Sequence, residues 1–117
     1  MSNPRLLAPE DLARMERLSP RLRGRFGDQA QLHRTAEECA EAGACAMRYA
    51  RQDWKSPESD PHAEHLAEEI ADAIITLHTA AQIVGTPAVR RHLLAKLART
   101  EALVGIVPTP TSEAPNA

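Results

Sequence analysis

The chain has 117 residues, 43% of them hydrophobic, which suffices for one domain with a single core and makes two domains improbable. Only 3% of the residues are aromatic, alanine and leucine are abundant and runs of β-branched residues are nearly absent, so the composition predicts an all-α fold. A formal net charge of −2 argues against nucleic acid as a partner, because that binding needs a basic surface.

Residues 1–27 are expected to form a short helix followed by a basic connector. Pro9, Glu10 and Asp11 are typical of a first helical turn, since proline presets the backbone and acids suit the helix dipole. The following stretch, SPRLRGRFG at 19–27, is punctuated by proline and glycine, which predicts a connector with about one helical turn. Its arginines are interpreted as a solvated surface in preference to a site for phosphates or nucleic acid.

Residues 28–105 are expected to form a helical domain that follows this connector, with residues 106–117 as a proline-rich, disordered tail. Capping residues, prolines and glycines predict three helices: Asp28 to about Gln52, Asp60 and Pro61 to Gly85, and Thr86 and Pro87 to Gly105.

The helix predicted to follow Pro61 is apolar on more than one side. Projection at 100° per residue places one set of residues on a common face and leaves Ile75 and Ile83 outside it: Leu66, Ile70, Ala73, Leu77 and Val84. Such a helix needs more than one partner, so we expect a second subunit to cover part of it, in a homodimer or homotetramer.

The sequence has no apolar run long enough for a signal peptide or for a membrane span of about 18 residues. Cys39 and Cys45 lie six residues apart in one predicted helix, about 9 Å along its axis, which is too far for a disulfide. We therefore expect reduced cysteines and a soluble, cytoplasmic protein with no membrane partner.

An acidic phrase occurs twice, as AEECAEA at 36–42 and as AEEIADA at 67–73. Each copy places two carboxylates three residues apart and hence on one helix face, Glu38 with Glu41 and Glu69 with Asp72. A solvated face is the simpler interpretation. Against it, several acids stand four residues from another acid, where a stable surface helix pairs an acid with a base, so the pattern favours an external cation.

Antiparallel packing of the two acidic helices would bring these carboxylates together. Mutual repulsion would then raise their pKa values unless a divalent cation were bound, and an all-oxygen set suits Mg²⁺ or Mn²⁺ better than zinc. Because Mg²⁺ is commonly shared with substrate phosphates, the site predicts a phosphorylated substrate. Lys96 and Arg99, late in the fourth helix, could neutralise its phosphates, although bases there also suit the helix dipole.

The order EECAE, a loop, EEIAD and a short helix carrying KLAR resembles the all-α nucleoside triphosphate pyrophosphohydrolases, a MazG-like superfamily with EExxE and ExxD motifs. The resemblance covers about Gln31 to Glu101. It implies an oligomeric four-helix bundle with the acidic second and third helices antiparallel. It also implies Mg²⁺-dependent hydrolysis of a nucleoside triphosphate, NTP or dNTP, to the monophosphate and pyrophosphate, which clears non-standard or excess nucleotides.

The resemblance also implies the roles of individual residues. Glu38, Glu41, Glu69 and Asp72 would ligate the metal, with Glu38 and Glu37 as the catalytic acids, Glu37 orienting or deprotonating water. Lys96 and Arg99 would bind phosphates. Many relatives carry an asparagine a few residues beyond the basic residue of the last helix, often followed by another base, where this chain has Thr100 and Leu103.

Three further expectations concern the remaining residues and the rival functions. Trp54 lies between the acidic motifs and could stack on a nucleobase or cover the site, although packing between subunits is preferred. His62 and His65 lack the spacing of a zinc helix and have no cysteine nearby in the sequence, so zinc is not expected. The rival functions are hydrolysis of phosphoribosyl-ATP and a non-catalytic helical interaction module.

Overall fold

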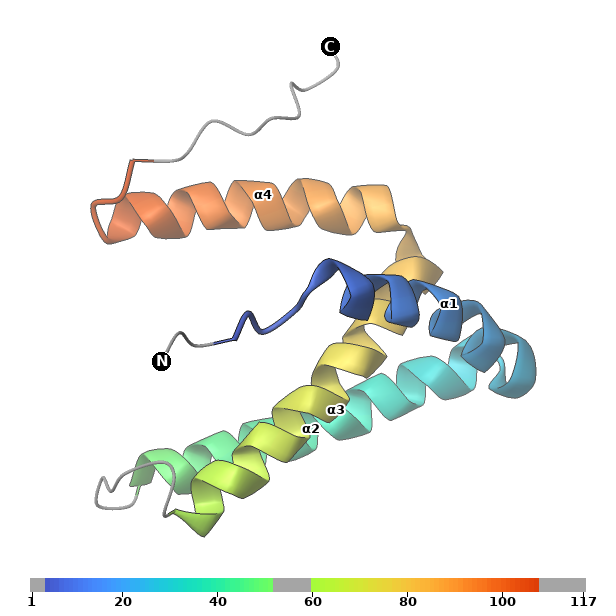
Figure 1. Cartoon of the computed structure of the whole chain (residues 1–117), viewed down its shortest axis with the longest axis horizontal. Coiled ribbons are helices and arrows are strands. Elements are labelled where there is room, and N and C mark those ends of the chain that lie inside the picture. Colours follow the sequence, from blue (N-terminus) through green and yellow to red (C-terminus); the bar gives the residue numbers. More distant parts are fainter. Residues whose placement is uncertain (1–3, 52–59, 108–117) are drawn as a thin grey trace. The chain divides into compact units, whose positions relative to one another are not determined.

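The computed structural model describes residues 4–51 and 60–107, which contain four α-helices and no strand (Figure 1). The helices are α1 (Pro9–Phe26), α2 (Asp28–Arg51), α3 (Pro61–Val84) and α4 (Thr86–Leu103). The predicted all-α fold is therefore confirmed. The chain divides into two compact units, Met1–Ile83 and Val84–Ala117, and each is described by itself.

Helix α1 is longer than the sequence predicts, and the connector expected at 19–27 is wrong. The helix runs unbroken through Pro20 to Phe26, and Gly27 ends it with a φ of 88°. Ser19 is only 1% exposed, and its Oγ lies 3.0 Å from Thr79 Oγ1 and 3.2 Å from His78 Nδ1. These contacts with α3 fix the backbone at the point where proline would otherwise favour a break.

An ion pair joins the end of α1 to the start of α2. Arg23 Nε and Nη2 donate to the two carboxylate oxygens of Asp28, at 2.8 Å and 3.1 Å. The hydrogen bond from Arg23 lowers the pKa of the Asp28 carboxyl below its ordinary value. Asp28 is the first residue of α2, and its ion pair with Arg23 links the start of α2 to the end of α1.

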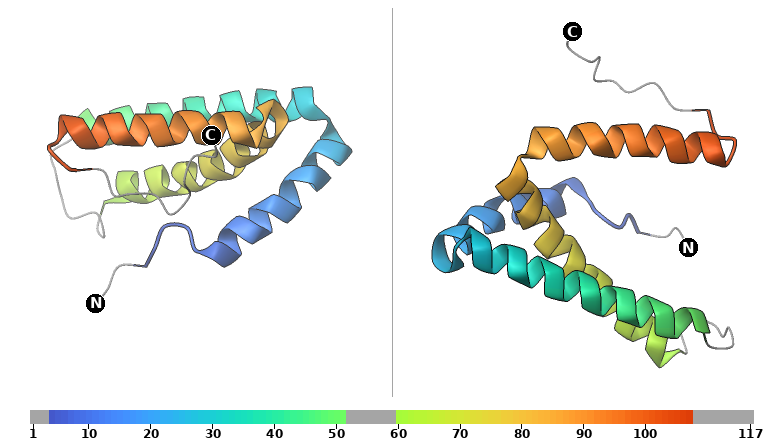
Figure 2. Two further views of the ribbon diagram at one scale, coloured as in Figure 1. Left: turned by 90° about the horizontal axis from the view of Figure 1, so that it is seen from above. Right: turned by 180° about the vertical axis from the view of Figure 1, so that it is seen from behind.

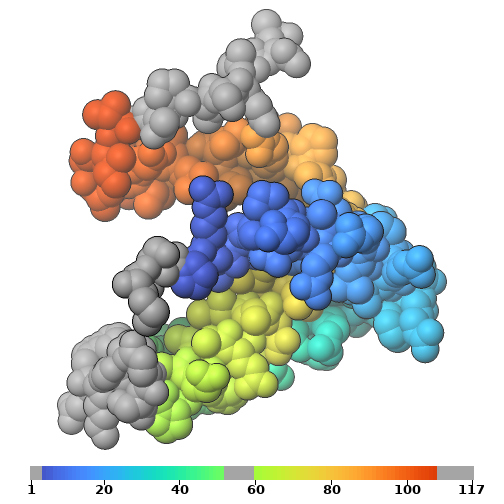
Figure 3. Space-filling model, in the orientation of Figure 1, coloured from blue at the N-terminus to red at the C-terminus, as the bar shows by residue number. Residues whose placement is uncertain are grey.

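Helices α2 and α3 lie side by side and run antiparallel (Figure 2). Thr35 Oγ1 donates to the Thr76 carbonyl oxygen at 3.1 Å, while further along α2 the Cys45 Sγ lies 3.7 Å from His65 Nδ1. Residues later in α2 therefore meet residues earlier in α3. Helix α1 packs across α3 in the same unit, as the space-filling view shows (Figure 3).

The ends of α3 agree with the predicted boundaries. Asp60 Oδ1 accepts a hydrogen bond from the His62 backbone N–H at 2.9 Å, which is the capping contact expected before Pro61. Helix α3 ends at Val84, immediately before Gly85, whose φ of 110° suits glycine.

The buried residues of the described chain are mostly polar. Only Met15, Cys45 and Ala73 are buried hydrophobic residues, whereas the buried polar set is larger: Ser19, Gln31, Glu38, Asp60, Thr76 and Thr79. Of the apolar face projected for α3, Ala73 is buried but Leu77 remains 50% exposed. Helix α4 has no buried residue at all. Many apolar side chains of the described helices are thus exposed.

The described helices were searched for membrane spans, and the two cysteines for a disulfide bond. None of them combines the length and apolar character needed to cross a bilayer. Cys39 and Cys45 are both free, as expected from their spacing. The predicted tail at 106–117 lies outside the described residues except for its first two positions.

Candidate metal centre

Three carboxylates from two helices converge in the first unit. Glu38 and Glu41 come from α2 and Glu69 from α3, and one oxygen of each lies within 4.8 Å of the others. Glu38 is buried, Glu69 is half-buried and Glu41 is exposed, so the group opens from the helix interface toward solvent. The antiparallel packing of α2 and α3 produces this convergence. We call these three residues the acidic cluster.

The two inner acids of the cluster share a pattern in which one oxygen is paired and the other is not. Glu38 Oε1 lies 3.4 Å from Arg34 Nη2, and Glu69 Oε1 lies 3.4 Å from His65 Nε2. The Oε2 atoms of Glu38 and Glu69 are buried and have no hydrogen-bond partner in the described part of the chain. Because buried polar atoms are almost always bonded, these two oxygens need a donor or a cation.

The donor set of the acidic cluster suits a hard cation. Three carboxylates offer only oxygen, which Mg²⁺ and Mn²⁺ accept readily. The residues present therefore fit the ion that the sequence predicts. The fit rests on the two unpartnered oxygens, because acids grouped at a protein surface are common without any metal.

Cys45 lies close to His65 in the folded chain, although the two residues are 20 positions apart in the sequence. The Cys45 Sγ lies 3.7 Å from His65 Nδ1 and accepts a hydrogen bond from Arg48 Nη2 at 3.1 Å. The expectation that no cysteine lies near this histidine is therefore wrong for the folded chain. Among the described residues, however, the donors that converge as a group are the three carboxylates, and the thiol is not one of them.

The other predicted site residues lie outside the acidic cluster. Asp72 is half-buried on α3 and is not part of the group within 4.8 Å. Glu37 is exposed on α2. Lys96 and Arg99 are exposed on α4, in the second unit. Trp54 lies outside the described residues.

Sequence analysis missed the two bases that hold the inner acids. Arg34 precedes Glu38 by four residues, and His65 precedes Glu69 by four residues. The signal was present, since residues four apart are neighbours on a helix. Arg34 with Glu38 is a pair of opposite charge at this spacing, and His65 stands at the same spacing from Glu69.

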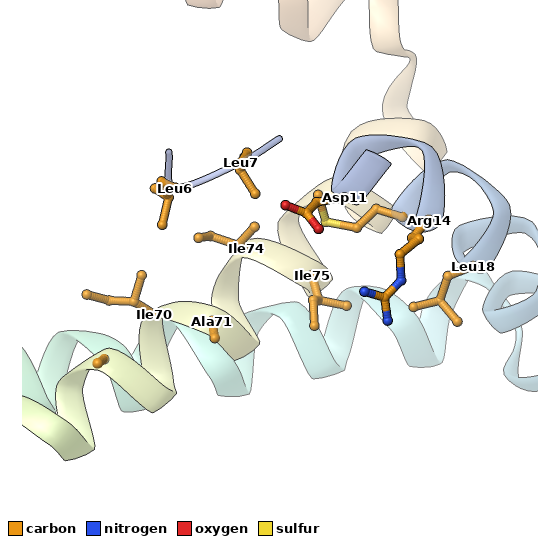
Figure 4. Close-up of a pocket in the computed structure, with 11 residues that line it drawn as sticks. Leu6, Leu7, Asp11, Arg14, Leu18, Ile70, Ala71, Ile74 and Ile75 are labelled. Atoms are coloured by element: carbon orange, nitrogen blue, oxygen red, sulfur yellow. The ribbon is translucent and has the colours of Figure 1, made fainter. Parts of the chain in front are cut away.

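Two grooves flank the helices of the first unit. The first has a volume of about 460 Å³ and is lined by residues of α1, of the segment before it and of α3. Figure 4 shows Leu6 and Leu7 facing Ile70 and Ile74 across this groove. The second, of about 500 Å³, is formed by α1, α2 and α3 and is lined by Leu22, Phe26, Ala30, Gln31, His33, Arg34, Glu37, Ile75 and Thr76. We call the second the Phe26 groove.

Comparison of the chain with models of protein families, with curated proteins and with solved structures gave no match. The function of this protein is therefore inferred from its own residues and geometry.

Proposed function

We propose that this protein is a Mg²⁺-dependent nucleoside triphosphate pyrophosphohydrolase, which converts an NTP or dNTP to the monophosphate and pyrophosphate, with Mn²⁺ as a possible substitute ion. The observation that carries the proposal is the pair of buried, unpartnered oxygens, Oε2 of Glu38 and of Glu69, within a group of three carboxylates. The EECAE and EEIAD motifs, which supply these acids, support the choice of reaction. We place this activity in the cytoplasm.

In this proposal Glu38, Glu41 and Glu69 would hold the ion, and Asp72, three residues beyond Glu69 on α3, would be a fourth ligand. The bound ion would neutralise charge that develops on the phosphate oxygens and would make water a better nucleophile. Glu37, exposed on α2, would orient the attacking water and accept its proton.

The remaining polar residues bind the substrate. Lys96 and Arg99 stand three residues apart on α4, both exposed, and would contact the phosphate oxygens. Trp54 would pack between subunits, the interpretation preferred for it from the sequence. The assignment of Lys96 and Arg99 depends on the resemblance to the pyrophosphohydrolases.

We further propose that the active form is a homodimer or homotetramer. Support comes from the exposed apolar side chains of α3 and α4, among them Leu77 at 50%, Leu93 at 52% and Leu97 at 49%. Clusters of exposed apolar side chains mark association sites in many proteins.

The decisive experiment measures pyrophosphate against orthophosphate release from a panel of common and modified nucleoside triphosphates and from phosphoribosyl-ATP. We expect metal-dependent pyrophosphate release that Glu38→Gln reduces by at least about a hundredfold, since loss of a direct metal ligand should exceed the effect of losing an outer partner. Glu16→Gln, an exposed acid of α1, is the matched control and should keep full activity.

The other outcomes separate the rival functions. Turnover of phosphoribosyl-ATP alone would move the assignment to that reaction. No release from any substrate would contradict the enzyme and favour a helical interaction module.

A further inference from the structure

The Phe26 groove has the size and the mixed lining of a small-ligand site. Its volume of about 500 Å³ lies within the range of about 300–1,000 Å³ that is usual for such pockets. Apolar side chains from α1 and α3, Phe26 and Ile75, form part of its wall, and α2 supplies the polar groups Gln31, His33 and Glu37. An aromatic ring beside amide, imidazole and carboxylate groups suits a flat heterocycle with polar edges.

Arg34 connects this groove to the acidic cluster. It lines the groove, and its Nη2 atom lies 3.4 Å from Glu38 Oε1. The Arg34 side chain remains 58% exposed, whereas that of Glu38 is 8% exposed, so the guanidinium retains donors that face solvent. A planar guanidinium can bond a carboxylate and a phosphate at the same time through different N–H groups.

We propose that the Phe26 groove binds the nucleoside part of the nucleotide, and that Arg34 contacts its α-phosphate where the groove meets the acidic cluster. This inference rests on the proposed function, since it assigns the position of the substrate in that reaction. The base stacks on the Phe26 ring, which is 54% exposed. The buried Gln31 amide and the exposed His33 imidazole, which both line the groove, are available for the polar edges of the base.

The test measures binding in the absence of metal, so that it does not depend on turnover. Isothermal titration in EDTA would follow AMP, GMP, CMP and UMP and their free nucleosides. We expect Arg34→Gln to weaken binding of the preferred monophosphate about tenfold and to leave the matching nucleoside within about twofold, because the nucleoside makes no contact with Arg34 in this arrangement. Phe26→Ala should weaken both ligands about tenfold or more through loss of stacking.

Two controls match these variants. Arg17→Gln removes the same charge from an exposed position of α1 outside both grooves, and Met47→Ala truncates an apolar side chain of α2 that is 53% exposed. Both should bind as the unsubstituted protein does. Nuclear magnetic resonance of the amides should place the ligand-induced shifts at Gln31, His33 and Thr76.

Shifts confined to the groove beside Leu6 and Ile70, saturable binding by none of the four monophosphates, or equal weakening by Arg17→Gln and Arg34→Gln would overturn the inference. Failure of the proposed function is distinguishable from these results. Binding in the groove without pyrophosphate release would contradict the proposed reaction but support the groove as the nucleoside site. Turnover with unchanged binding in Phe26→Ala would support the reaction but contradict the groove as the nucleoside site.

Discussion

Oε1 of Glu38 pairs with Arg34 and Oε1 of Glu69 lies 3.4 Å from His65 Nε2, whereas the Oε2 atom of each acid is buried and has no partner in the described chain. Arg34 and His65 thereby hold the two carboxylates in fixed orientations while leaving Oε2 of each acid available. Such an arrangement is unfavourable without a ligand, because a buried polar atom loses its bonds to water and gains none. Preparing the acids in this way lowers the reorganisation that binding of a cation would require.

Metal binding should therefore appear as a change in stability. We expect Mg²⁺ or Mn²⁺ at about a hundred times its dissociation constant to raise the free energy of unfolding by about 2.7 kcal/mol. Glu69→Gln should abolish this gain and, in metal-free buffer, should be more stable than the unsubstituted protein by about 1 kcal/mol. Thermal unfolding with and without EDTA measures both effects. An equal response to metal in Glu69→Gln would show that the acidic cluster is not the binding site.

Removal of the Ser19 hydroxyl should lower the stability of the protein. Ser19 is 1% exposed and bonds both Thr79 and His78 on α3. Ser19→Ala leaves these groups without that partner and should destabilise the protein by about 1–3 kcal/mol in urea unfolding. Thr100→Ala, whose exposed hydroxyl bonds only the Lys96 carbonyl oxygen of its own helix, should change stability far less. Similar losses in the two variants would argue against a structural role for Ser19.

At the scale of the helices, the ends follow local chemistry more closely than the interiors do. Asp60 with Pro61 starts α3, and the residues with positive φ at Gly27 and Gly85 separate successive helices. These boundaries could be read from the sequence because each depends on one or two residues. The continuation of α1 past Pro20 could not, because it depends on contacts with residues about 60 positions away, Ser19 with Thr79.

The cap of α3 gives a prediction at this scale. Asp60→Ala removes the carboxylate that accepts from the His62 N–H and should destabilise the protein by about 1 kcal/mol. Asp60→Asn keeps an acceptor oxygen and is expected to lose only a fraction of that amount. Hydrogen exchange at the His62 amide provides the local measurement, and an unchanged rate in Asp60→Ala would contradict the assigned cap.

The candidate site, like the helices, could be predicted only in part from the sequence. Spacing of three residues placed Glu38 with Glu41 on one face of α2, and antiparallel packing brought Glu69 to them. Asp72 has the same spacing from Glu69 but lies outside the group, because the register of α2 against α3 determines which turn is nearest and no local pattern encodes that register. The Phe26 groove likewise combines residues of three helices and has no signature in the sequence.

For the whole molecule, the distribution of apolar residues is the main constraint. Large hydrophobic side chains remain exposed on every described helix, and α4 buries none of its residues. On α3 the buried residues are small or polar, Ala73, Thr76 and Thr79, and of these only Ala73 belongs to the apolar face projected from the sequence. Association of chains would cover the remainder.

Sedimentation equilibrium tests this association. We expect a mass that is a multiple of the chain mass, and we expect Leu77→Glu on α3 or Leu93→Glu on α4 to raise the dissociation constant at least about tenfold, since each buries a charge in the proposed interface. Val107→Glu, at a position 85% exposed and beyond α4, is the matched control. A monomer at all concentrations, or equal effects of the three substitutions, would contradict the proposed oligomer.

The scarcity of buried hydrophobic residues also bears on how the protein responds to temperature. Apolar surface exposed on unfolding is what makes the heat capacity change large, typically about 12–15 cal/mol/K per residue. With Met15, Cys45 and Ala73 as the only buried hydrophobic residues described, a lone chain is expected to show a heat capacity change below that range. Its stability would then vary little between cold and warm conditions, and strong curvature with temperature would support the proposed association of chains.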